Sequence, residues 1–250
     1  MRLRVPAGTG ARNRPAFYAL SLGGWRDYLT LLHPPYTLWH LSYVVLGASL
    51  SPNLHYDRLG ATLLAFFLAL GISAHALDEL NGRPLQTRIP DLVLIVLAIA
   101  GLAGAVALGI AQVVAGSYWL LAFIAFGAFI LPAYNLEWFR GRLHSDPWFA
   151  VSWGTFPFLT AYWVSAERFG LSALFGALAV FLVSLVQRTL SRRVRTIRRR
   201  VRSMEGEIIY NSGTADRVDR AWALEADERA LSLMAVAMVL LSVATLALRL

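Results

Sequence analysis

Cysteine and lysine are both absent from the 250 residues. Without cysteine, the chain has no disulfide scaffold, no thiolate nucleophile and no cysteine-ligated metal. Without lysine, all 23 basic residues are arginines and no Schiff-base nucleophile is available. The sequence therefore excludes thiol and imine chemistry.

Charged residues are also scarce, at 15%, whereas hydrophobic residues reach 57% and the mean hydropathy is +0.55. These values lie outside the range of soluble globular proteins and are typical of polytopic membrane proteins. We therefore expect one all-α membrane domain, because helices satisfy their own backbone groups in lipid. The net charge of +8 favours membrane lipids, and an anionic inner leaflet in particular, as partner, and we expect no nucleic acid.

About seven apolar segments can cross the roughly 30 Å of hydrocarbon in a bilayer. They cover residues 36–50, 59–80, 91–113, 118–138, 148–165, 171–188 and 230–248. Connections with few charges alternate with arginine-bearing ones, so the positive-inside rule places the arginine-bearing ends in the cytoplasm. The sequence therefore predicts a multi-pass protein of the cell inner (plasma) membrane with a cytoplasmic N-terminus and an external C-terminus.

The expected organisation has four parts. Residues 1–35 are a cytoplasmic segment with an interfacial lead-in, 36–188 a six-span bundle, 189–228 a basic amphipathic cytoplasmic segment, and 229–250 the last transmembrane helix. In the third part apolar residues recur at helical spacing among arginines, at Leu190, Val194, Ile197, Val201 and Met204. This pattern predicts a helix on the anionic inner leaflet up to about residue 202, followed by a loop and a short helix.

The second apolar segment ends in ionisable side chains, which must face protein, water or an ion rather than lipid. His75, Asp78 and Glu79 stand at i, i+3 and i+4, so one helix end can direct all three into a cavity. That arrangement suits cation binding or proton transfer. In the alternative interpretation they mark the polar end of the helix at the headgroups and pair with Arg83 or Arg88.

Small residues and prolines mark other apolar segments. Gly101, Ala105 and Gly109 recur at the spacing that allows helices to approach closely in lipid. Pro132 and Pro157 predict kinks, which can open a cavity between helices.

Three stretches together resemble the UbiA-type intramembrane prenyltransferases. They are residues 27–50, with a proline entry and a small-residue exit, residues 74–91, where the family has its first acidic motif, and residues 133–163, with a tyrosine, basic residues and a glycine-bearing helix. The chain is similar to a divergent member of that superfamily with degenerate acidic motifs. The resemblance implies a UbiA-like bundle that joins an isoprenoid diphosphate to a lipophilic acceptor.

The acidic motifs depart from the family pattern. Ala74 stands in place of the first motif's Asn, His75 in place of its first Asp and Gly82 in place of its last, so that Asp78 alone matches, with Glu79 beside it. At the expected second motif, residues 187–193 carry arginines and no carboxylate. In the family two carboxylate clusters hold Mg²⁺ ions that bridge the diphosphate.

Carried onto this chain, the resemblance assigns Asp78 and Glu79 to one Mg²⁺ and, with His75, to catalysis. It assigns substrate binding to six residues: Arg83, Arg88, Tyr134, Asn135, Arg140 and Arg142. Guanidinium groups, including Arg192, would neutralise phosphate in place of the missing acids. Aromatic rings such as Tyr134, Trp153 and Phe156 could face an allylic cation.

Two other interpretations stay open. The loss of most motif acids favours a catalytically retired protein that binds a lipid, quinone or pigment as a subunit of a membrane complex. A metal site of imidazole and carboxylate ligands is the third, with His75, Glu79, Glu137 and His144 as its members.

Overall fold

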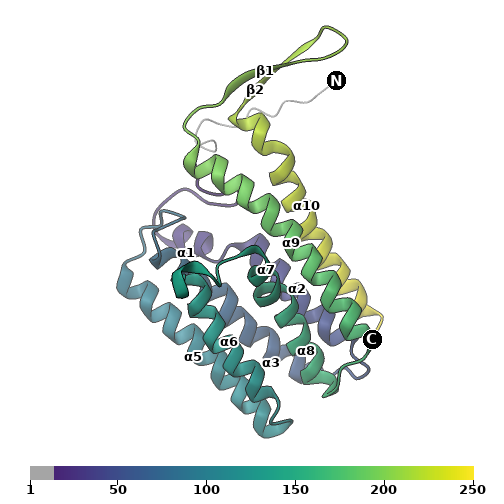
Figure 1. The fold of residues 1–250 in the computed structure, drawn as a ribbon. Helices are drawn as coiled ribbons and strands as arrows, with labels where there is room; N and C mark the ends of the chain where they lie inside the picture. The colour runs from purple at the N-terminus through teal and green to yellow at the C-terminus, as the bar shows by residue number, and fades with distance from the viewer. Residues whose placement is uncertain (1–13) are drawn as a thin grey trace.

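The computed structural model describes residues 14–250, and most of them lie in helices (Figure 1). The first half contains α1 (Trp25–Leu31), α2 (Pro34–Leu50), α3 (Tyr56–Phe66), the π-helical η1 (Phe67–Ala74), α4 (His75–Leu80) and α5 (Asp91–Ala115). The second half contains α6 (Leu120–Asn135), the 3₁₀ turn η2 (Phe139–Gly141), α7 (Asp146–Phe149), the π-helical η3 (Ala150–Thr155), α8 (Phe156–Ala166), α9 (Leu171–Arg200), β1 (Glu205–Ile209), β2 (Ala215–Asp219) and α10 (Arg220–Ala247).

Four helical segments are long and apolar enough to cross a membrane: Tyr56–Leu80, Asp91–Ala115, Leu171–Arg200 and Arg220–Ala247. The first of them joins α3, η1 and α4 without a break. The other predicted spans, 36–50, 118–138 and 148–165, are also helical, in shorter elements. The all-α membrane fold is therefore supported, whereas the crossing of these three segments stays a prediction.

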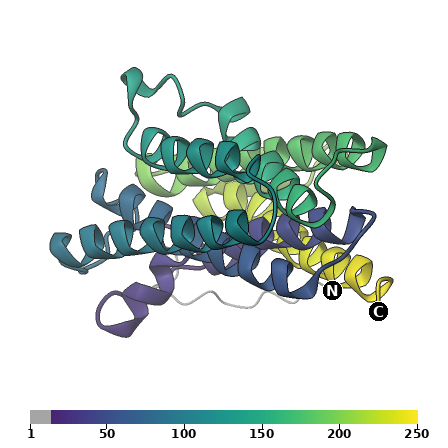
Figure 2. The same cartoon turned by 90° about the horizontal axis from the view of Figure 1, so that it is seen from below.

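Helix α2 lies at the centre of the packing, against α8 on one side and α10 on the other. Figure 2 shows the same bundle seen from below, with α9 in green and α10 in yellow. Gly47 permits the α2–α8 contact, because a Cβ at this position would lie 2.1 Å from the Phe158 carbonyl oxygen. Buried polar groups join α2 to α9: Trp39 Nε1 donates to Tyr43 Oη at 2.6 Å, and Ser184 Oγ donates to the same oxygen at 3.1 Å.

The region after residue 188 differs from the sequence-based expectation. Helix α9 continues without a break to Arg200 and runs beside α10 beyond the rest of the bundle (Figure 1). Its apolar stripe packs on α10, where Val194 and Ile197 share a core with Leu224. The amphipathic pattern therefore reflects a seam between two helices. Contact of the exposed arginines with an anionic leaflet stays a prediction.

The expected loop and short helix over residues 210–228 are instead a β-hairpin and the start of α10. The strands pair antiparallel, with Glu205 opposite Asp219 and Ile209 opposite Ala215. Gly213, with a φ of +79°, supplies the left-handed residue that the turn requires. Asp219 then caps α10, where its side chain accepts a hydrogen bond from the Trp222 amide at 2.8 Å.

Replacing Gly47 with alanine should destabilise the bundle, because the new methyl group would overlap the Phe158 carbonyl. Overpacking of this kind costs about 1–3 kcal/mol. Gly60→Ala in α3 is the matched control, since a Cβ there meets nothing within 4 Å. Thermal unfolding in detergent should show a lower midpoint for Gly47→Ala alone. Equal midpoints for the two variants would contradict the close α2–α8 contact.

Candidate functional site

A polar cavity of about 910 Å³, its open mouth included, lies where α2 begins and α4 and α6 end. Its wall is completed by the segment before α1, by α7 and η3, and by the middle of α9. The polar lining residues are Tyr18, His33, Tyr36, His40, His75, Asp78, Tyr134, Asn135, His144, Gln187, Arg188, Ser191, Arg195 and Arg199. The structure thus gathers one carboxylate, three guanidinium groups and four imidazoles around one space.

One wall of the cavity is cationic. Arg188, Arg195 and Arg199 stand at i, i+7 and i+11 on α9, so they share one helix face. Arg188 is paired with Asp146 at 3.2 Å and lies 5.3 Å from the centre of the Phe149 ring. Within residues 14–250, Arg195 and Arg199 form no ion pair. Their charges are therefore available to a ligand.

The opposite wall contains His75 and Asp78 of α4. The His33 ring stacks on His75 with 4.0 Å between ring centres, and His75 Nδ1 lies 3.2 Å from the Gly71 carbonyl oxygen. His75 and Asp78 belong to α4, which continues directly from the π-helical stretch η1. Such stretches are frequent at functional sites because they shift which side chains face inward. The predicted residues His75 and Asp78 are therefore cavity-facing.

Several buried polar atoms of this cavity have no hydrogen-bond partner among residues 14–250. They are His33 Nε2, His40 Nδ1, Tyr134 Oη and Gln187 Oε1. Tyr134 and Gln187 are only 3% and 2% exposed. Leaving a buried polar atom unsatisfied costs about 1–3 kcal/mol, so a polar ligand or water is expected to pair with them.

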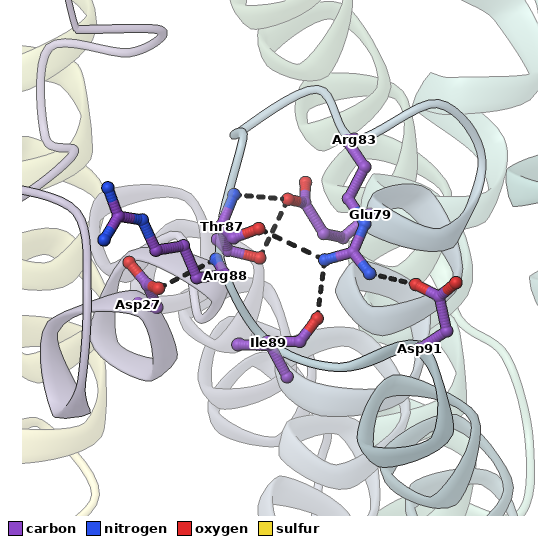
Figure 3. Close-up of polar contacts among 7 residues, drawn as sticks. All are labelled: Asp27, Glu79, Arg83, Thr87, Arg88, Ile89 and Asp91. Atoms are coloured by element: carbon purple, nitrogen blue, oxygen red, sulfur yellow. Dashed lines mark hydrogen bonds and ion pairs between the residues drawn. The ribbon is translucent and has the colours of Figure 1, made fainter.

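Glu79 is not among the residues that line the cavity, and its side chain points into the loop between α4 and α5 (Figure 3). It is fully buried, and its carboxylate accepts hydrogen bonds from Leu85 N at 2.9 Å, Thr87 N at 2.8 Å and Thr87 Oγ1 at 2.9 Å. The physical cause is the early end of α4 at Leu80, after which the chain folds back over Glu79. Amides and a hydroxyl therefore compensate this charge, in place of the cation or guanidinium expected from the sequence.

A second carboxylate holds the same loop. Asp27 is buried, and its two oxygens accept hydrogen bonds from Gly23 N and Arg88 N, each at 2.8 Å. The side chain of Arg88 is exposed and points away from Glu79 (Figure 3). Arg83 binds the carbonyl oxygens of Thr87 and Ile89 at 3.2 and 2.6 Å and pairs with Asp91. Both arginines therefore lie outside the cavity.

The other predicted substrate-binding residues divide into two groups. Tyr134 and Asn135 line the cavity, and the Tyr134 ring stacks on His144 with 4.4 Å between ring centres. Arg140 and Arg142 are exposed in the connection between α6 and α7, where Arg140 has a φ of +61°. The resemblance therefore assigned Arg140 and Arg142 to a cavity that they do not line.

The side chains predicted as metal ligands are not brought together in one place. Among residues 14–250 no group of three histidine or acidic side chains is close enough to hold a metal ion. His75 and His144 line the cavity, whereas Glu79 is committed to the loop and Glu137 is exposed. Mg²⁺ prefers several hard oxygen ligands in octahedral geometry, and Asp78 is the single carboxylate from residues 14–250 that lines this cavity.

An apolar groove of about 730 Å³ adjoins the polar cavity. It lies between α3, η1, α5, α6 and α8, and Leu70 and Trp153 line both spaces. Gly101 packs on η1, where a Cβ would lie 2.7 Å from the Leu68 carbonyl oxygen, as its spacing predicts. Gly109 likewise allows a close approach to α6, where a Cβ would lie 2.9 Å from the Ile124 side chain, and both Ala105 and Gly109 also line the groove. The small residues of α5 therefore allow close helix packing and also leave room for the groove.

Sequence reasoning missed the cationic wall. The clearest available signal was the seven-residue spacing of Arg188 and Arg195, which places both on one helix face. The predicted sixth span ended at residue 188, so Arg188 and Arg195 fell into two separate predicted segments and their shared face was not recognised. His33 and His40, also seven residues apart, carried the same signal in α2.

Comparison with protein-family models, with curated proteins and with solved structures found no match to this chain. The resemblance to UbiA-type prenyltransferases therefore stays a prediction.

Glu79→Gln should loosen the loop over residues 81–90. The glutamine amide nitrogen is a donor, so it cannot accept the hydrogen bond that one of these backbone amides donates to Glu79. Hydrogen bonds to charged groups contribute about 1.5–3 kcal/mol. Hydrogen exchange at the Leu85 and Thr87 amides should accelerate, and the unfolding midpoint should fall. The control is Glu137→Gln, at an exposed carboxylate. Unchanged exchange in Glu79→Gln would contradict the loop contact.

Acidification should destabilise the fold through His33. Burial, followed by the charges of His75, Arg199, Arg195 and His40, lowers the pKa of His33 well below its ordinary value of 6.5. The unfolded chain then binds more protons, so stability falls as the pH drops below about 6.5. His33→Asn should flatten this dependence, because asparagine tolerates the φ of +46° without titrating. If wild type and His33→Asn lose the same stability on acidification, His33 is not the cause.

Proposed function

We propose that this chain is a multi-pass inner-membrane protein that binds an isoprenoid lipid with a phosphate or diphosphate headgroup. The observation that carries the proposal is the shared wall of the two spaces. A cationic polar cavity meets an apolar groove at Leu70 and Trp153, so one amphipathic molecule can occupy both. The resemblance to UbiA-type proteins supports the isoprenoid class of lipid.

The polar cavity suits an anionic headgroup. Guanidinium groups bind phosphate oxygens through paired, charge-assisted hydrogen bonds, which are shorter and stronger than neutral ones. Arg195 and Arg199 are unpaired within the described chain, and the hydroxyl of Tyr134 is buried without a partner. A phosphate would satisfy all three side chains.

The apolar groove suits a branched hydrocarbon chain. Phenylalanine rings line it together with small residues of α5 and α6, including Gly109 and Gly127. A lipid tail is already out of water in the bilayer, so entering the groove brings little hydrophobic gain. The headgroup therefore supplies most of the affinity, and the groove selects the shape of the chain.

The orientation follows from the distribution of arginines. The cavity opens at the end of the bundle that contains the arginine-bearing loops and the α9 extension, which we place in the cytoplasm with the N-terminus. The last residues lie at the opposite end, where Arg249 Nη2 donates to the Pro52 carbonyl oxygen at 3.0 Å. Seven crossings account for this separation. The exposed arginines of α9 would then meet an anionic leaflet.

Prenyl transfer to a lipophilic acceptor is the second candidate function. It is favoured by aromatic rings at the junction of headgroup and tail, where Tyr134 and Trp153 lie edge to face with 5.3 Å between ring centres. Rings so placed can stabilise an allylic cation. Release of diphosphate from an isoprenoid diphosphate, measured with quinone precursors as acceptors, separates transfer from binding alone. Binding without release would support a retired protein, such as a lipid-binding subunit of a membrane complex.

Binding of farnesyl diphosphate to the full-length protein in nanodiscs tests the proposal. Arg195→Gln should weaken binding about 10- to 100-fold, since a charge-assisted hydrogen bond contributes about 1.5–3 kcal/mol. Arg140→Gln is the matched control and should bind as wild type does, because Arg140 is exposed outside the cavity. Equal affinity in all three proteins would overturn the assignment of the headgroup to this cavity.

A further inference from the structure

We infer that the headgroup is held by guanidinium groups and neutral donors, without a bridging Mg²⁺ ion. This inference rests on the proposed function and names the recognition chemistry of the same cavity. It departs from what the UbiA resemblance implies, where metal ions neutralise the diphosphate. The disagreement arises from the side chains that the fold brings together.

The carboxylates required for a metal are committed elsewhere or absent. Both oxygens of Glu79 accept hydrogen bonds from the α4–α5 loop, and turning them into the cavity would leave Leu85 N and Thr87 N buried without a partner. Asp146, the nearest acid to the cationic wall, is shared between Arg188 at 3.2 Å and Arg192 at 2.7 Å. Asp78 alone cannot supply the oxygen ligands that Mg²⁺ requires.

The cavity carries instead the groups that bind phosphate directly. Arg195 and Arg199 are one helical turn apart, or about 6 Å along the axis, which lets them contact neighbouring phosphoryl groups. Arg188 lies roughly 10 Å from Arg195 along the same face, held by Asp146. Three guanidinium groups also repel a metal cation from the same space. The positive charge that a metal would supply is therefore already part of α9.

The unpartnered neutral atoms agree with this assignment. A phosphate offers only acceptors when fully ionised, so its partners must be donors. Tyr134 Oη can donate, and His33 Nε2 can donate in one tautomer. Gln187 can present its amide nitrogen after rotation of the side-chain amide, which exchanges the positions of O and N. Three of the four buried unsatisfied positions, at Tyr134, His33 and Gln187, can thus donate to one headgroup.

The role of Asp78 distinguishes the two kinds of recognition. In a metal-bridged site this carboxylate is a ligand, so Asp78→Asn would weaken binding. In a metal-free site it is the one acidic side chain of the described lining that faces the headgroup, so its removal should leave binding unchanged or strengthen it. The sign of the change therefore tests the inference without any assay of turnover.

The experiment measures binding of farnesyl diphosphate to the full-length protein in nanodiscs, in EDTA and in excess Mg²⁺. We expect the same affinity in both, unchanged or tighter binding by Asp78→Asn, and weaker binding by Arg199→Gln. Arg142→Gln, at an exposed position outside the cavity, is the matched control. Titration of the protein with Mg²⁺ alone should give no saturable signal.

Saturable binding that requires Mg²⁺ and is lost in Asp78→Asn would overturn the metal-free headgroup site while leaving the proposed lipid-binding function intact. Absence of saturable binding under every condition would instead overturn the proposed function itself. Because Asp78 and Arg199 line an open cavity and form no ion pair within residues 14–250, both variants are expected to fold. Unfolding midpoints equal to that of wild type confirm that the comparison concerns binding.

Discussion

The buried carboxylate of Glu79 determines how the polar end of this bundle is built. A charge with no exposed surface must be compensated within the protein, and here two backbone amides and one hydroxyl of the following loop do so. These bonds fold residues 81–90 back over α4 and satisfy amides that lipid could not satisfy. They also fix the rotation of α4, so that Asp78 and His75 face the cavity while Glu79 does not. The different positions of the adjacent acids, Glu79 in the loop and Asp78 at the cavity, follow from this contact.

The seam between α9 and α10 determines the opposite wall. Apolar contacts and the ion pair of Arg198 with Glu228 hold the two helices together beyond the bundle. The Nη1 atom of Arg198 also donates to the Arg14 carbonyl oxygen at 3.0 Å, which ties the segment before α1 to α9. Because α9 cannot turn within this seam, Arg195 and Arg199 remain directed at the cavity. Its partner helix thus holds an arginine-rich helix in place as one wall of the cavity.

Periodicity and composition predicted the positions of the helices, because apolar segments and their charged ends are local features of the sequence. The same local information placed His75 and Asp78 near a polar site, and the resemblance to UbiA-type proteins added Tyr134. It did not predict that Glu79 would turn into a loop, since that depends on amides six and eight residues later. It also did not predict the arginine wall, because the stripe at Val194 and Ile197 suits either a lipid surface or a second helix. Only tertiary packing selects between them.

The combination of a preformed cationic wall with an apolar groove has a consequence for selectivity. A mobile metal ion adjusts its position to the phosphate, whereas arginines fixed on one helix face present donors at set intervals along α9. In the proposed complex the position of the headgroup is then determined by α9, and the junction at Leu70 and Trp153 lies at a fixed distance from it. A lipid that binds as proposed must therefore match both the spacing of the guanidinium groups and the point at which its chain turns into the groove. Selection rests on this geometry, because the tail gains little free energy by leaving the bilayer.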